Sequence, residues 1–285
     1  MTHVVNDLAQ LRDTVRGWAR AGERLAFVPT MGNLHAGHFS LVRQAREHAD
    51  RVVASVFVNP TQFGPNEDFA RYPRTPDQDV AGLRDAGCDV LWMPDVETMY
   101  PFGAGNAVQV RVPGVTDVLE GAHRPGHFDG VATVVARLLL QVQPDVALFG
   151  RKDYQQLAVI RYMAREMSFP VEIVAATTVR EPDGLAMSSR NQYLSADERP
   201  RAAEIHRALQ AMRDATIGGQ PYDAVEAEAT RRLRGAGFDV DYAVVRRRDL
   251  VDATSADTAL VALIAARLGR TRLIDNLEFE RPAAA

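Results

Sequence analysis

The chain has 285 residues, of which 46% are apolar and 25% are charged, and its net charge is −4. This composition is typical of a soluble globular protein with a sizeable core rather than a disordered chain, and no apolar run reaches the roughly 18 residues of a membrane-spanning helix. The acidic balance and the lack of long basic runs argue against general nucleic-acid binding. With a single cysteine, Cys88, no internal disulfide can form. We therefore expect a cytoplasmic protein with small-molecule partners and no membrane association.

The first 180 residues alternate short β-rich runs with longer segments of helical periodicity. Alternation of this kind predicts a doubly wound α/β fold with a parallel sheet, and such sheets bind ligands at the carboxyl ends of their strands. The predicted strands are residues 25–30, 51–59, 88–94, 145–150 and 171–179. The predicted helices are residues 39–49, 76–87, 130–143 and 154–167.

The pattern changes after Val179. A turn-rich stretch leads into a long helix from about Ala196, then a second helix that ends near residues 234–239, and two strand candidates at 240–248 and 259–269. This order predicts a small α+β unit with antiparallel strands. We therefore predict two domains, a Rossmann-like domain over 1–179 that binds nucleotide and substrate, and a small α+β domain over 180–285 that covers the active site.

Two histidines follow the first predicted strand, in the sequence PTMGNLHAGH. His35 and His38 flank Gly37 at the start of a predicted helix. Free backbone N–H groups and the positive end of the dipole favour a phosphate there, and Gly37 lets a ligand approach the backbone. The alternative is that each histidine is only a helix cap. Two histidines around a glycine directly after a strand favour the phosphate site.

Two amides follow the next strand, in VNPTQFG. Pro60 forces the chain out of the sheet, so Asn59 and Gln62 stand at the strand's carboxyl end, where they can bind a hydroxyl or a carboxylate. An equally weighted alternative is a polar loop whose amides satisfy backbone groups.

Lys152 is the only lysine, since the other 32 of the 33 basic residues are arginine. It follows Gly150 in FGRKDYQQ, again at the end of a predicted strand. A lysine is a compact charge on a flexible stem that can follow a phosphate through a reaction, whereas an arginine holds a planar partner in a fixed geometry. The alternative is an ordinary surface lysine left by a strong arginine bias. Its place at a strand end favours a phosphate-binding role.

The stretch DGLAMSSRNQYLS, residues 183–195, offers hydroxyl and guanidinium donors. Ser188 and Ser189 lack the surroundings of a covalent nucleophile, and Arg190 can hold a phosphate or a carboxylate. On composition alone, an interdomain linker with a capping serine is an alternative.

Five motifs taken together resemble the pantoate-β-alanine ligase, or pantothenate synthetase, family. They are PTMGNLHAGH, VNPTQFGPNEDFARYPRT, HRPGHFDG, FGRKDYQQ and AMSSRNQYLS, and they occur in the family's order between residues 27 and 195. The resemblance implies a Rossmann-like fold of the HIGH-type nucleotidyl-transferase kind. It also implies the activity: ATP-dependent condensation of pantoate with β-alanine to pantothenate through a pantoyl adenylate, with release of AMP and pyrophosphate.

The same resemblance implies a set of site residues. His38, Lys152, Ser188, Ser189 and Arg190 would be the catalytic residues. The residues expected to bind ATP are Met31, His35, Gly37, His38, Gly150, Lys152, Asp153, Val179, Met187, Ser188, Ser189 and Arg190. The residues expected to bind pantoate are Asn59, Gln62 and Gln156, with a supporting role for His127.

Further expectations concern the metal and the partners. Mg²⁺ is expected with ATP, held by Asp79 or otherwise through the ATP phosphates, and no tightly bound organic cofactor is expected. A homodimer through the N-terminal domain is expected. Arg151 stands where the family usually has Glu, and Gln78 stands where some relatives have another acid.

Two other functions share the same residues. A nucleotidyl transferase would retain AMP in its product, whereas a non-catalytic nucleotide sensor would bind ATP without turnover. The amides Asn59, Gln62 and Gln156 favour an enzyme, because a sensor has no need of a second polar subsite.

Overall fold

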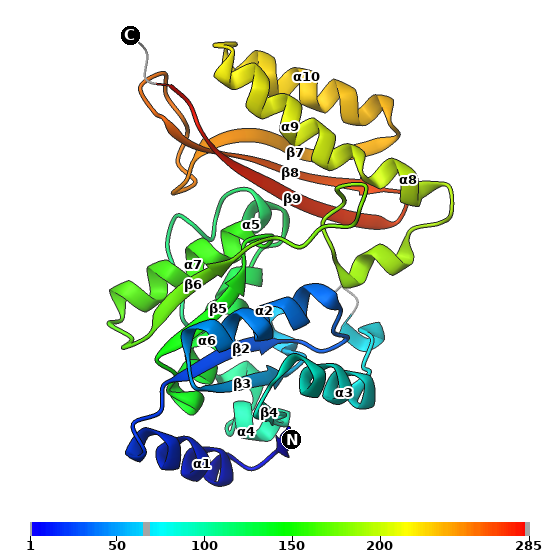
Figure 1. Cartoon of the computed structure of the whole chain (residues 1–285). Helices are drawn as coiled ribbons and strands as arrows, with labels where there is room; N and C mark the ends of the chain where they lie inside the picture. The colour runs from blue at the N-terminus through cyan, green and yellow to red at the C-terminus, as the bar shows by residue number, and fades with distance from the viewer. Residues whose placement is uncertain (1, 65–68, 283–285) are drawn as a thin grey trace. The chain divides into compact units, whose positions relative to one another are not determined.

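A computed structural model describes residues 2–64 and 69–282 of the chain. The chain divides into two compact units, which Figure 1 draws together. The first unit contains Met1–Arg151 and Gln156–Thr177, and the second contains Lys152–Gln155 and Thr178–Ala285. The four-residue segment with the lone lysine is thus grouped with the second unit. The predicted roles of the two parts stay predictions.

The first unit is built on a six-stranded parallel sheet with the strand order β1-β4-β3-β2-β5-β6. Every neighbouring pair is parallel, which confirms the predicted doubly wound sheet. The strands are β1 His3–Val5, β2 Leu25–Thr30, β3 Arg51–Val56, β4 Val90–Trp92, β5 Val146–Gly150 and β6 Glu172–Ala176.

Helices cover both faces of this sheet, because alternate side chains of each strand enter different cores (Figure 1). On β2, Phe27 packs with α1, α6 and α7, whereas Ala26 and Val28 pack with α2 and α3. The helices of this region are α1 Leu8–Arg20, α2 Ala36–His48, α3 Pro76–Ala86, α4 Val96–Met99, α5 Glu120–His123, α6 His127–Val142 and α7 Tyr154–Glu166.

The direction of the strand order reverses between β2 and β5. From β2 the chain moves through α2 to β3 on one side, whereas β5 pairs with β2 on the other side and continues to β6. Connections that leave two adjacent strands in opposite directions open a crevice at their carboxyl ends. The segments that follow Thr30 and Gly150 therefore start at the position where doubly wound sheets bind ligands.

The second unit contains a three-stranded antiparallel sheet in the order β7-β8-β9. Its buried face packs against α9 and α10 in a separate apolar core, so this unit has its own hydrophobic stabilisation. The strands are β7 Phe238–Arg247, β8 Ala259–Leu268 and β9 Thr271–Glu280, and the helices are α8 Glu198–Ala202, α9 Glu204–Ile217 and α10 Tyr222–Gly235.

The structure corrects several predicted boundaries. Strands β1 and β9 are absent from the prediction, and the single helix predicted from about Ala196 is two helices, α8 and α9, with a break at Ala203. The predicted strand over 51–59 ends at Val56, and the one over 88–94 covers only Val90–Trp92. In the part of the chain that the structure describes, no helix is both long and apolar enough to cross a bilayer.

Candidate active site

The turn between β2 and α2 is held in an unusual backbone conformation. Gly32 has φ +84° and Asn33 has φ +50°, so two successive residues occupy the left-handed region. The carboxylate of Asp79, on α3, accepts hydrogen bonds from the backbone N–H groups of Asn33 at 3.0 Å and Leu34 at 2.8 Å. Asp79 is 2% exposed. A buried carboxylate therefore fixes the turn that leads to the two histidines.

The two histidines form a reciprocal cap at the start of α2. His35 Nδ1 accepts from the Gly37 N–H at 3.1 Å, and His38 Nδ1 accepts from the His35 N–H at 3.4 Å. Their ring centroids lie 4.2 Å apart. Because both Nδ1 atoms accept, each neutral ring carries its proton on Nε2. The two histidines therefore act as helix caps through Nδ1, which is compatible with a ligand-binding role, and that role stays a prediction.

The predicted amide pair lies in a tight turn after β3. Asn59 caps the 3₁₀ helix Pro60–Gln62, and its Nδ2 donates to Gln62 Oε1 at 3.2 Å. Asn59 is 1% exposed and Gln62 is 8% exposed. The structure therefore brings these two predicted residues into direct contact.

Gln62 links the amide pair to two other predicted residues. Its Nε2 donates to Met31 Sδ at 2.7 Å, in the turn after β2. Its carbonyl oxygen lies 2.9 Å from His127 Nδ1, and Arg124 Nη1 lies 3.0 Å from His127 Nε2. Since a guanidinium only donates, Nε2 accepts and the neutral His127 carries its proton on Nδ1. His127 thus supports the backbone of the amide turn.

The remaining predicted residues of the first unit lie beside β5. Gly150 is the last residue of β5 and pairs with Ala176 of β6. Gln156 lies in the first turn of α7 and is partly exposed.

Lys152 is anchored to β9 through its backbone. The Asn276 Nδ2 donates to the Lys152 carbonyl oxygen at 2.9 Å, and the Tyr154 hydroxyl donates to Glu278 Oε1 at 2.9 Å. The Lys152 side chain is 18% exposed, and its Nζ lies 3.6 Å from Asp153 Oδ1. The convergence of this ammonium with the two imidazoles stays a prediction.

A hairpin-like turn carries the serines and Arg190. The Met187 N–H donates to the Val179 carbonyl at 2.9 Å, so these two predicted residues face each other across the turn. Ser188 then caps the 3₁₀ helix Ser189–Tyr193 through its Oγ, which accepts from the Arg190 N–H at 3.3 Å. Among the described residues, the Arg190 guanidinium makes no hydrogen bond or ion pair, so it is available to an anion.

The carboxylate of Asp79, the expected metal ligand, already accepts hydrogen bonds within the fold. Both carboxylate oxygens of Asp79 already accept backbone N–H groups, and the Thr75 hydroxyl donates to Oδ1 at 3.1 Å. Within residues 2–64 and 69–282, no three His, Cys, Asp or Glu side chains gather as a metal ion would require. The role of Asp79 as a metal ligand stays a prediction.

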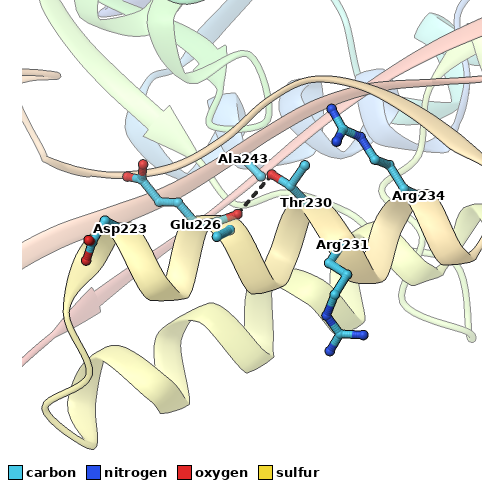
Figure 2. A pocket seen from close by; sticks show the side chains of 7 residues that line it. Asp223, Glu226, Thr230, Arg231, Arg234 and Ala243 are labelled. Carbon is cyan, nitrogen blue, oxygen red and sulfur yellow. Dashed lines mark hydrogen bonds between the residues drawn. The ribbon is translucent and has the colours of Figure 1, made fainter.

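Figure 2 shows a separate pocket of about 560 Å³ on α10, lined in part by Glu226, Arg231 and Arg234. The Glu226 carboxylate accepts from the Val245 N–H at 2.8 Å, so its charge is used within the fold. None of the predicted site residues lines this pocket.

The parallel sheet with helices on both faces and a reversal of strand order defines a Rossmann-like protein. Comparison with known proteins gives the family. Residues 3–278 match the family model described as pantoate-beta-alanine ligase. A pantothenate synthetase of Stenotrophomonas maltophilia (strain K279a) is 64% identical over 279 residues, which are 98% of this chain and 100% of that protein.

Two solved structures agree over almost the whole chain. The pantothenate synthetase of Thermus thermophilus is 48% identical with a TM-score of 0.90, and the match covers 97% of this chain and 99% of that one. The pantoate-beta-alanine ligase of Francisella tularensis, complexed with beta-gamma ATP and beta-alanine, is 31% identical with a TM-score of 0.82 over 98% of both chains. The chain belongs to the pantoate-β-alanine ligase family.

The family activity follows from this membership. The chain is a C–N bond-forming, AMP-forming ligase that condenses pantoate with β-alanine through a pantoyl adenylate and releases AMP and pyrophosphate. The two alternatives left by the sequence, a nucleotidyl transferase that retains AMP in its product and a non-catalytic sensor, are set aside.

Three residues that contact the site residues were not identified from the sequence. Tyr100 donates to Asn59, Arg124 contacts His127, and Asn276 anchors Lys152. Tyr100 and Asn276 lie outside all five motifs, whereas Arg124 lies in the HRPGH motif. Of these three residues, only Arg124 could have been found from a sequence motif.

Proposed function

We propose that residues of the first unit make most of the contacts to pantoate and to the adenosine part of ATP. In this proposal His35 and His38 donate from Nε2 to the phosphates, and Met31, Gly37 and Gly150 shape the nucleotide pocket. The amides of Gln62 and Gln156 bind the hydroxyls and the carboxylate of pantoate, and Asn59 belongs to the same subsite through its hydrogen bond to Gln62. Unpaired buried amides are costly, so a substrate that lacks a hydroxyl is rejected.

The second unit supplies the cations and hydroxyls for the triphosphate. Lys152, Ser188, Ser189 and Arg190 bind the β and γ phosphates, Asp153 contacts the ribose, and Val179 and Met187 lie beside the nucleotide. The Arg190 guanidinium supports this assignment, because it has no partner among the described residues and a guanidinium fork suits a phosphate.

The chemistry requires charge neutralisation and positioning. The pantoate carboxylate attacks the α phosphate and pyrophosphate leaves; the β-alanine amine then attacks the acyl carbon and AMP leaves. Two anions must approach each other in the first step, so His38, Lys152 and Arg190 stabilise the developing charge. The enzyme forms no covalent intermediate.

Magnesium enters with ATP as part of the substrate in this proposal. The occupied carboxylate of Asp79 supports coordination through the phosphates rather than by the protein.

One contact carries the proposal most directly: Gln62 Nε2 lies 2.7 Å from Met31 Sδ. Within one unit, this contact joins the turn that leads to the histidines with the amides expected to bind pantoate. Attack on the α phosphate requires that nucleotide and pantoate bind side by side. The contact therefore supports adjacent subsites.

Lys152→Ala tests the assignment. The variant keeps the backbone carbonyl that Asn276 binds, so it is expected to fold. Pantoate-dependent pyrophosphate release should fall by about a hundredfold or more, because a phosphate loses its mobile cation. Arg161→Ala, which removes an exposed cation from α7, is the matched control and should retain its rate. A near-normal rate for Lys152→Arg would show that a compact ammonium is not needed.

We further propose that the protein is a cytoplasmic homodimer joined through its N-terminal domain. The unpaired and buried Cys88 supports a reducing compartment. Light scattering after gel filtration tests the dimer, since a mass near 31.3 kDa would mean a monomer.

A further inference from the structure

The side chain of Asn59 is fully occupied by the protein. Its Nδ2 donates to Gln62 Oε1 and to the Gly130 carbonyl, both at 3.2 Å. Its Oδ1 accepts from the Thr61 N–H at 3.3 Å and from the Tyr100 hydroxyl at 2.7 Å. An amide has two N–H donors, and both are used. Asn59 in this conformation therefore has no N–H left for a ligand.

Gln62 is the member of the pair that can still donate. Its Oε1 is held by Asn59, and one N–H of Nε2 points to Met31 Sδ. A thioether is a weak acceptor, and the second N–H of Nε2 has no partner among the described residues. Because Asn59 fixes Oε1, it also fixes the direction of the Nε2 donors.

Tyr100 makes the shortest hydrogen bond to Asn59. The phenol is 2% exposed, and burial raises its pKa, so it is a neutral donor at physiological pH. The Thr61 hydroxyl lies 3.3 Å from the phenol oxygen and 3.1 Å from Asn59 Oδ1. The two hydroxyls thus meet at the same amide oxygen.

Helix α6 packs against Tyr100 and the turn that contains Asn59 and Thr61. The Arg137 guanidinium lies 5.0 Å from the centre of the Tyr100 ring, and its Nη1 donates to the Met99 carbonyl at 3.0 Å. At Gly130 an added Cβ would lie 2.4 Å from the Thr61 carbonyl oxygen. This close packing explains why Arg137 stands within the apolar run of α6 and why a glycine faces the amide turn.

We propose that Tyr100 is a positioning residue for pantoate, which acts through Asn59 to aim the Gln62 amide at a pantoate hydroxyl or carboxylate. The inference rests on the proposed pantoate subsite. It divides the roles within that subsite: Gln62 contacts the substrate, while Tyr100 and Asn59 determine the direction from which it does so. Tyr100 also contributes to the choice between pantoate and analogues that lack a hydroxyl.

Tyr100→Phe tests the inference, because it removes one hydroxyl and leaves the ring beside Arg137. The KM for pantoate should rise roughly five- to tenfold, with the KM for ATP and kcat within about twofold of wild type. The preference for pantoate over an analogue with one hydroxyl replaced by hydrogen should fall. In a background of Asn59→Ala, Tyr100→Phe should have no further effect on the KM for pantoate.

Tyr222→Phe is the matched control, since its hydroxyl donates to the Thr254 carbonyl in the second unit. It should leave all constants unchanged. An unchanged KM for pantoate in Tyr100→Phe, or an equal rise for pantoate and ATP, overturns the inference. If Tyr100→Phe does not fold, Thr61→Val is judged by the same criteria. Gln62→Ala tests the proposed pantoate subsite separately from the positioning role of Tyr100. If this variant leaves the KM for pantoate unchanged, the proposed subsite itself is wrong.

Discussion

Asp79→Asn tests whether this carboxylate fixes the turn that leads to His35 and His38. The substitution keeps the size of the side chain but replaces one oxygen by an N–H₂ group. Leu34 N–H and the Thr75 hydroxyl both donate to Oδ1, whereas Asn33 N–H donates to Oδ2. The asparagine loses least when its oxygen takes the place of Oδ1 and keeps the bonds from Leu34 and Thr75. Its N–H₂ group then faces the backbone N–H of Asn33, and these two donors cannot bond to each other.

The loss is one hydrogen bond to a buried charged acceptor. Such bonds contribute about 1.5–3 kcal/mol each, so the free energy of unfolding of the first unit should fall by about 2–3 kcal/mol. The KM for ATP should rise about tenfold, because the turn before His35 is no longer fixed. The KM for β-alanine should stay unchanged.

Urea unfolding followed by tryptophan fluorescence measures the first quantity. Both tryptophans, Trp18 and the buried Trp92, lie in the first unit, so the signal reports the unit that contains Asp79. Asp77→Asn, an exposed carboxylate in the same first turn of α3, is the control. A change below about 0.5 kcal/mol with an unaltered KM for ATP would refute the reasoning. Recovery of activity at high magnesium concentration would instead identify Asp79 as a metal ligand.

Two further predictions concern ionisable groups outside the proposed site. Burial raises the pKa of the Cys88 thiol to about 12, so a thiol reagent should label it only as the first unit unfolds in urea; rapid labelling of the native protein would contradict this. Burial and the nearby Arg180 lower the pKa of His206, so the unfolded chain binds a proton at a higher pH than the folded one. The stability of the second unit should therefore fall as the pH drops below about 6.5, and His206→Gln should flatten this dependence in urea titrations followed by circular dichroism.

The parallel sheet was predictable because its central strands are buried on both faces. Residues 25–30 and 145–150 read as continuous apolar runs, and each is followed by a helical pattern, so both their type and their connection follow from the sequence. Strand β1 has only three residues, two of which are exposed, and it offers no comparable run.

Strand β9 was missed because its pattern is interrupted by buried polar residues. Asp275 and Asn276 are each 4% exposed. Arg180, 95 residues away, neutralises Asp275 at 2.6 Å, and Asn276 binds the Lys152 carbonyl. Their partners are distant in sequence, so no local reading could show that an aspartate belongs on a buried face.

The candidate site residues likewise divide into those with a local sequence signal and those whose contacts are distant in sequence. His35, His38, Asn59 and Gln62 lie directly after strands, and strand ends can be read from the sequence. Tyr100 follows no strand, and its connection to Asn59 exists only through folding. Candidate residues in the segments after strands were thus accessible from the sequence, whereas Tyr100, whose connection depends on distant partners, was not.

The central claim is that the pantoate carboxylate attacks the α phosphate of ATP. Pantoate labelled with ¹⁸O in its carboxylate, incubated with ATP, magnesium, β-alanine and this protein, tests it directly by mass spectrometry of the nucleotide product. The account predicts AMP that carries one ¹⁸O atom, because the acyl–oxygen bond breaks when the amine attacks. Unlabelled AMP, or ADP with labelled phosphate, would contradict it.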